Sequence, residues 1–231
     1  MEASSIFNLH SSIMTSHYQV RHYVPAAGYT RIFERRAEGL SLDYGVVHLG
    51  RGEAFFEDTG DNEVMLIVLT GRCELLVGHN GNKAHGIIGE RTTVFDGRAY
   101  RVYVPYRTTY ELIAHDTPVE VAVCKTASDI DAAALILAPG ETQDGSPYLL
   151  TAAEMVAHTT IAGGAIGHFR FRQASEFAAV RLIGHGEAQV RVGHNDVLAL
   201  PDDWRVMSLE SAGRFYSLWV EGRGSGEARK H

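Results

Sequence analysis

Short apolar runs separated by turn residues recur along the whole chain. Many of these runs alternate apolar and polar positions, which is typical of strands with one buried face. Clusters of Gly, Asn and Asp mark the turns, as at residues 78–82 and 193–196. The pattern therefore predicts an all-β protein. The predicted strands cover residues 42–49, 64–69, 74–77, 101–104, 110–114, 119–124, 168–172, 177–183, 188–192, 197–200, 206–209 and 215–220.

The strand pattern is interrupted once, near the middle of the chain. Residues 128–137 are compatible with a short helix or an extended linker, and the segment 139–147, which contains Pro and Gly, is a connection. We therefore expect two modules. The predicted division is a first barrel over residues 14–128, a linker over 129–150, a shortened second barrel over 151–222 and a flexible tail over 223–231.

The two halves share an internal pattern. In each half a Glu precedes a Gly by eight residues across an apolar strand, and a Pro follows a later apolar triplet. The interval from Gly to Pro is shorter in the second half, which predicts that a hairpin is lost there. A duplicated barrel explains the pattern, and chance similarity between β-rich halves is the alternative. The matched pairs are Glu63 and Glu176, Gly71 and Gly184, and Pro105 and Pro201.

Composition and charge exclude several classes of protein. The chain has 231 residues, of which 45% are hydrophobic and 21% charged, enough for a packed core. Its net charge of −7 is unsuited to nucleic acid, which requires a basic face. The longest apolar run, residues 64–69, is too short to span a membrane, and the first residues show no export signal. Two cysteines cannot form a disulfide framework, so we expect a reducing cytoplasm.

The order of strand, Gly, hairpin and Pro followed by two more strands resembles the cupin family of small β-barrels. The resemblance implies a divalent metal held by His-x-His on one strand, a Glu, and a later His after the Pro. His-x-His occurs nowhere in this sequence, and no His directly follows Pro105 or Pro201. We therefore predict no metal ligands and no cofactor. Scattered ligands such as His158, His168 and Glu176 are the alternative.

The first half resembles one cupin family more closely. The segment 89–97 reads Gly-x-Arg-x-x-Val-Phe-x-Gly and is followed by Val-Tyr-Val-Pro at 102–105. Together with residues 49–53, 63–73 and 119–124, these motifs resemble the amino-terminal half of 5-deoxyglucuronate isomerase, a bicupin of bacterial inositol breakdown. The match covers residues 42–128. It implies two tandem barrels and the aldose–ketose isomerisation of a sugar acid.

The second half departs from that family. The resemblance implies a metal in the carboxy-terminal barrel, held in part by Pro-Pro-His-x-His and by a His after a Pro-x-Gly-Tyr turn. The first motif is absent, and the turn reads Pro201-Asp-Asp-Trp204-Arg205. Trp204 thus replaces the Tyr, and Arg205 replaces the ligand His. One hypothesis is that the charge of Arg205 takes over the oxyanion stabilisation that a metal would supply.

Polar residues of the second half supply the candidate site. His168, Arg170 and Arg172 alternate along one predicted strand and share a face. Pointing inward, that face is a cationic pocket for a carboxylate or phosphate; pointing outward, it is a solvated edge. The acidic residues Glu57, Asp58 and Asp61 are expected to be solvated surface near a turn. The catalytic candidates are His168, Arg170, Glu176 and Arg205, and the substrate-binding candidates are Arg172, Trp204 and Tyr216.

Three functions follow from these observations. The chain is an isomerase homologue, active or degenerate; or a metal-free bicupin that binds a sugar acid or another small ligand without catalysis; or a metal-dependent cupin enzyme of another type. We expect a sugar acid as the small-molecule partner and a homo-oligomer, because exposed strand edges need covering. No nucleic-acid or membrane partner is expected.

Overall fold

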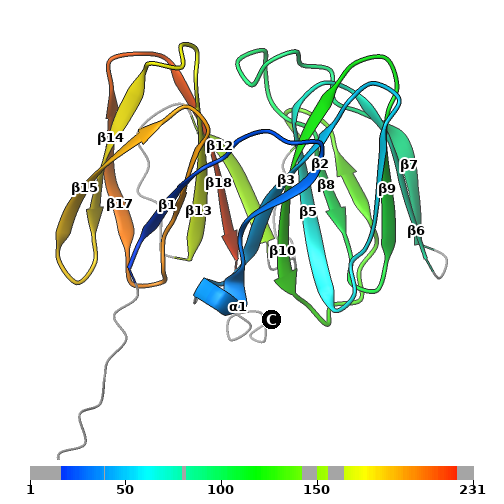
Figure 1. Ribbon diagram of the computed structural model, residues 1–231. Coiled ribbons are helices and arrows are strands. Elements are labelled where there is room, and N and C mark those ends of the chain that lie inside the picture. The colour runs from blue at the N-terminus through cyan, green and yellow to red at the C-terminus, as the bar shows by residue number, and fades with distance from the viewer. Residues whose placement is uncertain (1–16, 39, 80–81, 142–149, 156–163, 223–231) are drawn as a thin grey trace, which may run out of the picture.

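The computed structural model describes residues 17–38, 40–79, 82–141, 150–155 and 164–222. They form two β-barrels that lie side by side (Figure 1). Among these residues, helix is confined to α1, the short segment Arg35–Glu38. The predicted all-β class with two tandem barrels is confirmed. Within the described part of the chain, no helix is both long and apolar enough to cross a membrane.

The first barrel consists of two antiparallel sheets, one facing the second barrel (the first inner sheet) and one facing away (the first outer sheet). The first inner sheet contains, in spatial order, β11 (Leu135–Leu137), β8 (Arg101–Val104), β5 (Asn62–Thr70), β10 (Val119–Ala127), β3 (Asp43–Leu49) and β2 (Gly28–Phe33). The first outer sheet contains β4 (Ala54–Asp58), β9 (Thr109–Ala114), β6 (Cys73–His79) and β7 (Asn82–Ile88).

The second barrel is built in the same way. Its second inner sheet contains β1 (Gln19–His22), β16 (Asp196–Ala199), β13 (Ala165–Phe171), β18 (Phe215–Gly222) and β12 (Leu150–Met155). Its second outer sheet contains β15 (Glu187–Gly193), β14 (Phe177–Ile183) and β17 (Arg205–Ser211).

The two inner sheets pack against each other, which creates three apolar layers. Each barrel has its own interior core, and a third core joins side chains of both inner sheets. The central strands of the inner sheets are therefore buried on both faces, as every residue of β13 is. This double burial explains the continuous apolar runs of β5 and β10, because neither face of these strands meets water.

All the predicted strands are present in the structure. Among the described residues, the pattern missed six others, all of which lie at sheet edges. Strand β4, for example, exposes Ala54, Phe56 and Asp58 and turns only Phe55 and Glu57 inward. The ambiguous segment 128–137 is not helical, and its end forms β11. The missed strands are β1, β2, β4, β7, β11 and β12.

The topology corrects the expected correspondence between the halves. Strand β13, rather than β14, occupies the place of β5, because each lies between the strand before the Pro and the closing strand. The β14–β15 hairpin then corresponds to β6–β7, so the predicted loss of a hairpin is wrong. Matching Glu63 with Glu176 is wrong by one strand. Among the described residues, the second barrel has no counterpart of β4.

Two strands also lie elsewhere than the predicted division places them. Strand β1 falls within the range 14–128 but pairs with β16 in the second barrel. Strand β11 falls within the predicted linker but pairs with β8 in the first barrel. The chain therefore links the barrels at its amino-terminal side as well as in the middle. The predicted tail, 223–231, and the linker residues 142–149 lie outside the described residues.

The turn after β5 requires a glycine. Gly71 has φ of +85°, and a Cβ there would lie 2.1 Å from the carbonyl oxygen of Pro118. We expect Gly71→Ala to lower the free energy of unfolding by at least about 2 kcal/mol, because left-handed strain and a backbone clash act together. Gly186→Ala is the control, since no atom lies within 4 Å of its Cβ position. Denaturant unfolding of both variants checks this, and equal stabilities would contradict it.

Candidate functional site

Apolar side chains fill the interior of the second barrel. Trp204 and Trp219 are buried there with Phe169 and with aliphatic residues of the same core. The Trp204 indole lies against the backbone of Gly184, where an added Cβ would be 2.5 Å from the ring. Arg205 is exposed on the opposite face of β17 and does not enter the barrel. The hypothesis that Arg205 stabilises an oxyanion inside this barrel is therefore not supported by its placement.

His168 and Arg170 point away from the barrel interior but are not solvated, because the first inner sheet covers them. Arg170 donates to Glu120 of β10 at 2.7 Å, and both side chains are almost fully buried. The His168 Nδ1 and the Tyr44 hydroxyl are hydrogen-bonded at 2.8 Å. The sequence offered two alternatives, an open cationic pocket and a solvated edge. Neither is present, because Arg170 forms a buried ion pair between the barrels.

The buried cluster contains polar atoms that still require partners. Among the described residues, the Nε2 of His168 and the Nε of Arg170 are buried without one. A small polar molecule such as water is the usual occupant beside such atoms. Burial, with the charge of Arg170 next to it, holds the pKa of His168 well below its usual value. The ring is therefore neutral at physiological pH.

The motif that carries the family resemblance also lies at the contact between the two inner sheets, which we call the joint. Arg91 is buried and donates to the carbonyl oxygens of Leu69 (2.8 Å) and Gly97 (2.9 Å). Its guanidinium also donates to the Tyr216 hydroxyl at 3.3 Å and lies 5.2 Å from the centre of that ring. Arg91 thus fixes its own loop and connects the two barrels.

The remaining candidates lie apart from one another. The Arg172 guanidinium lies 5.2 Å from the centre of the Phe95 ring, at the edge of the joint. Glu176 accepts a hydrogen bond from the backbone of Gln173 within the β13–β14 turn. The predicted set therefore divides into residues of the joint, a turn, a barrel core and an exposed face. His158, the additional metal-ligand candidate, lies outside the described residues.

The mouth of the first barrel holds a polar cluster that the sequence analysis missed. Glu57 on β4 and Tyr110 on β9 lie directly opposite each other in the ladder, and both point inward. The Tyr110 hydroxyl donates to Oε2 of Glu57, and the Lys125 ammonium of β10 forms an ion pair with Oε1. Three strands from both sheets of the barrel therefore converge on one carboxylate.

Aromatic rings surround this cluster, which we call the mouth triad (Glu57, Tyr110 and Lys125). The Lys125 ammonium lies 4.8 Å from the centre of the Tyr29 ring. The ring of Phe55 lies 6.0 Å from that of Tyr29 and 6.1 Å from that of Tyr110. Burial and the neighbouring carboxylate of Glu57 raise the pKa of Tyr110 well above its usual value, so its hydroxyl stays protonated and acts as a donor.

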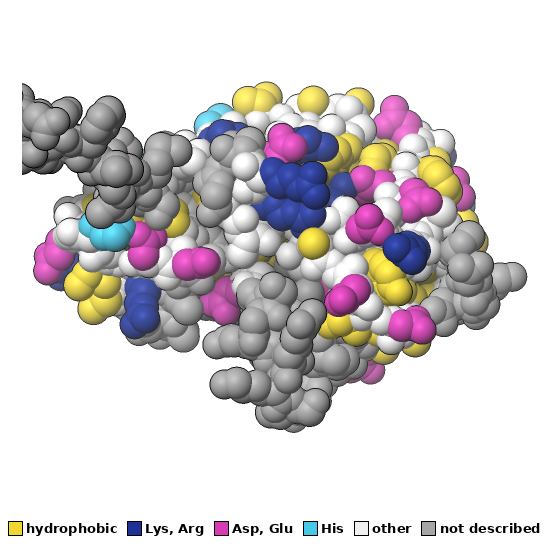
Figure 2. Space-filling model, turned by 90° about the horizontal axis from the view of Figure 1, so that it is seen from below, with side chains coloured by type: hydrophobic (Ala, Val, Ile, Leu, Met, Phe, Trp, Pro, Cys, Tyr) yellow, Lys and Arg dark blue, Asp and Glu magenta, His cyan; other side chains and the backbone are white. Residues whose placement is uncertain are grey.

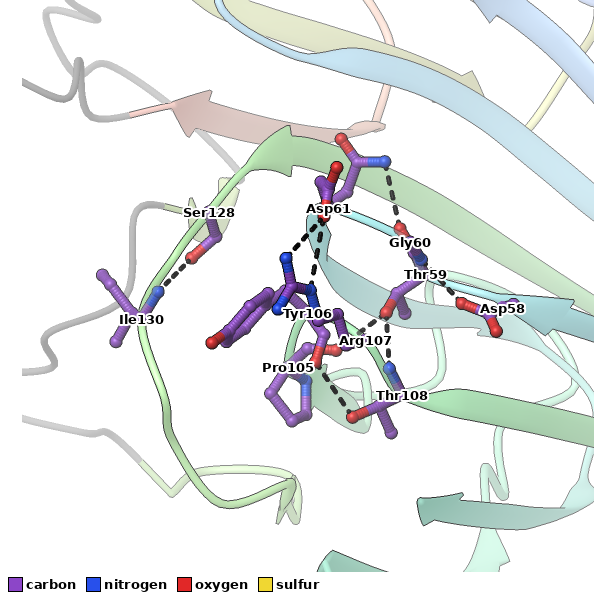
Figure 3. A network of polar contacts seen from close by, with 11 residues as sticks. Asp58, Thr59, Gly60, Asp61, Pro105, Tyr106, Arg107, Thr108, Ser128 and Ile130 are labelled. Atoms are coloured by element: carbon purple, nitrogen blue, oxygen red, sulfur yellow. Dashed lines mark hydrogen bonds and ion pairs between the residues drawn. The ribbon is translucent and has the colours of Figure 1, made fainter. Parts of the chain in front are cut away.

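Two turns fix the rim of this mouth (Figure 3). The turn between β4 and β5 and the turn between β8 and β9 exchange hydrogen bonds through Thr59 and Thr108, at 2.9 Å in both directions. The Thr59 hydroxyl also donates to the carbonyl oxygen of Pro105 at 3.0 Å, and the Arg107 amide donates to that of Gly60 at 2.7 Å. The ends of β4 and β9, which carry Glu57 and Tyr110, are thereby held together.

The end of the molecule that carries this rim mixes charges of both signs. Basic side chains gather near the middle of the face, and acidic side chains surround them over the first barrel (Figure 2). The side chain of Lys125 is 12% exposed and that of Glu57 24%, so both are partly accessible to water. The expectation that Glu57 is solvated surface is wrong, whereas Asp58 and Asp61 are exposed as expected. The alternation of Phe55 and Glu57 was the available signal.

A separate cleft of 1110 Å³ lies where β5, β7 and β9 end. Arg72, Tyr100 and His115 are among its lining residues. The Nε2 of His115 lies 2.9 Å from Oε2 of Glu74, and hydrogen bonds to His85 and His115 lower the pKa of that carboxyl. His115 is half exposed. Water therefore screens these charges more than those of the mouth triad.

The described residues do not fit the metal that cupin relatives imply. No group of three or more His, Cys, Asp or Glu side chains that could hold a metal ion occurs among them. In the second barrel, the place of a ligand His is taken by an outward-facing Arg205, and the interior is apolar. We therefore assign no step of a reaction to a metal held by these residues.

Two antiparallel barrels with inner sheets in contact define the chain as a two-barrel cupin protein. Residues 20–146 match the model of the KduI/IolB family, which is more than half of the chain. The chain therefore belongs to the KduI/IolB family, as the resemblance of the first half to 5-deoxyglucuronate isomerase predicts. No curated protein sequence matches it.

Solved structures share the fold at low sequence identity. An IolB-like protein from Salmonella typhimurium LT2 has a TM-score of 0.71 and 18% identity, over 89% of this chain and 92% of that one. The protein Ylba from E. coli has a TM-score of 0.63 and 8% identity, over 89% and 90%. An oxalate decarboxylase mutant from Bacillus subtilis has a TM-score of 0.55 and 10% identity, over 88% and 75%.

The buried pair of Arg170 and Glu120 provides a test of the joint. We expect Arg170→Met or Glu120→Gln alone to cost about 3–5 kcal/mol of stability, because each leaves the other group buried without its partner. The double variant should lose less than the sum of the two. The exposed pair of Arg181 and Glu187 is the control, with little effect expected. Additive losses in denaturant unfolding would contradict this account.

The buried His168 ring leads us to expect a lower free energy of unfolding in acid. Its folded-state pKa is depressed, so the unfolded chain binds the proton more readily. Stability from the neutral ring is present above about pH 6.5 and falls as the pH decreases, by up to about 1.4 kcal/mol per pH unit. Unfolding from pH 7.5 to pH 5 should show a shallower pH dependence for His168→Gln than for wild type or for the exposed-site control His185→Gln. Identical slopes would contradict this.

Proposed function

We propose that this protein is a sugar-acid isomerase that interconverts aldose and ketose forms. The observation that carries the proposal is the family match over residues 20–146, since the KduI/IolB family suggests a sugar isomerase of inositol or uronate metabolism. The substrate that the family resemblance suggests is 5-deoxyglucuronate.

The reaction requires few chemical groups. A base takes a proton from the carbon next to a carbonyl, and a positive charge or donor stabilises the oxyanion of the enediol. A carboxylate, an ammonium and a phenol in one half-buried site supply these functions. Glu57, Lys125 and Tyr110 form such a set. This is why the proposed isomerase does not depend on the second barrel for its acid–base groups.

A second candidate function is the binding of a sugar acid without turnover, as an accessory or sensor protein. The filled second barrel favours it, because Trp204 lies where the family resemblance implies a residue of the metal-bearing turn. In that case the first barrel retains a polar mouth that recognises the ligand. Binding without conversion of the sugar distinguishes this candidate from the isomerase.

We also propose a cytoplasmic location and a homo-oligomer. Both cysteines are free and buried, which suits a reducing compartment. Phe56 and Ile87 are exposed on the outward face of the first outer sheet, a surface that a second copy would cover. Light scattering of the purified protein measures the mass in solution and decides between monomer and oligomer.

Turnover of 5-deoxyglucuronate tests the proposed function. We expect the purified protein to convert the aldose to the ketose, seen as new carbon resonances by NMR, and to exchange the transferred proton with solvent when the reaction runs in D₂O. A heat-denatured sample is the control. Binding without any conversion would contradict the isomerase and support the second candidate, and the absence of both would contradict each.

A further inference from the structure

The mouth triad has a chemistry that the family match does not assign. We infer that the mouth of the first barrel binds a carboxylate-bearing sugar through Lys125 and processes it with Glu57. The inference rests on the proposed function for the class of sugar. It locates the reaction in the first barrel and gives each member of the triad a role.

The Lys125 ammonium has N–H donors that remain available to a ligand. A lysine ammonium carries several N–H donors, and the structure gives it one hydrogen-bond partner, Glu57, with the Tyr29 ring below. Its side chain is 12% exposed, so the remaining donors are shielded but accessible. A charge in such a setting binds a carboxylate more strongly than an exposed lysine does, because less water competes.

The aromatic walls suit the remainder of a sugar. The rings of Tyr29, Phe55 and Tyr110 line the site beside the charged groups. A sugar acid has C–H surfaces as well as hydroxyl and carboxylate groups, so it needs apolar contact and charge within one site. Recognition sites typically combine a mostly apolar lining with a few placed polar groups. The mouth has this composition.

Glu57 is placed to carry a proton. One of its oxygens accepts from Tyr110 and the other faces Lys125, while the carboxylate remains 24% exposed. The phenol and the ammonium orient this carboxylate, and the interlocked rim turns fix the strand end that carries it. A base held in one orientation next to bound substrate gains from proximity as well as from its basicity.

The proton steps balance without an added reactant. Glu57 takes the proton from the carbon next to the carbonyl; that C–H electron pair forms the enediol double bond, and the carbonyl pair moves to oxygen. The proton of the neighbouring hydroxyl then moves to this oxygen, while Lys125 stays charged on the substrate carboxylate. The oxygen that lost its proton becomes the new carbonyl as the enediol double bond shifts back. Glu57 gives its proton to the former carbonyl carbon.

Variants of the triad test the inference. The assays are calorimetric binding of glucuronate, with glucose as the sugar that lacks a carboxylate, and turnover of 5-deoxyglucuronate. We expect Lys125→Met to weaken glucuronate binding by about tenfold or more, as loss of a charged hydrogen bond does. Lys125→Arg should restore part of it. We expect Glu57→Gln, which keeps the side-chain shape, to retain binding within a few-fold and to lose about 10²–10⁴-fold in kcat.

Matched controls use an exposed pair far from the mouth. Arg181→Met and Glu187→Gln alter the same types of charge on the second outer sheet, with side chains that are 59% and 77% exposed. Thermal unfolding of every variant shows whether it is folded. If Lys125→Met does not fold, Lys125→Arg and Glu57→Gln still report on geometry and on proton transfer.

The outcomes separate the site from the function. Weak binding by Lys125→Met with intact controls supports the site, whether or not the wild type turns over 5-deoxyglucuronate. Turnover by the wild type with Lys125→Met and Glu57→Gln both equal to the controls overturns the site and leaves the isomerase standing. Glucuronate binding without turnover overturns the isomerase and the role of Glu57 as a base, and it leaves the binding role of Lys125 standing. Neither binding nor turnover by the wild type overturns both.

Discussion

The burial of both inner sheets on both faces constrains the rest of the structure. Strands β5 and β13 meet a barrel interior on one side and the opposite barrel on the other, so neither has a face in water. Polar side chains on these sheets are tolerated only in pairs, because an unpaired buried charge costs several kcal/mol. Arg170 with Glu120 and His168 with Tyr44 satisfy this condition. The residues that look reactive in the sequence of β13 therefore act first as parts of the joint.

The two barrels differ in what they leave available for chemistry. The interior of the second is occupied by Trp204, Trp219 and their neighbours. The first has an apolar core below and a polar triad at its mouth. In the first barrel, strand β4 supplies Glu57 and pairs it with Tyr110.

Much of the fold could be predicted from the sequence, and little of the site. Alternation reveals strands that have one buried face, and continuous apolar runs reveal those with two. Neither pattern reveals short edge strands such as β4. The match of Glu63 with Glu176 failed because a shared spacing in the sequence does not show which strands pair. The alternation of side chains along a strand placed His168 and Arg170 on one face, but it gave no information on what covers that face. Glu57 was misplaced because its neighbours Asp58 and Asp61 are exposed.

The motif at 89–97, which carries the family resemblance, has a structural role. Arg91, in the segment 89–97, holds the carbonyl oxygens of Leu69 and Gly97 and reaches Tyr216 in the other barrel. Its hydrogen bonds fix its own loop and connect that loop to the second barrel. Family resemblance in this segment therefore reports on how the barrels are assembled. Assembly and the placement of reactive groups are separate requirements, so a chain can keep the first while its acid–base groups lie in a different barrel.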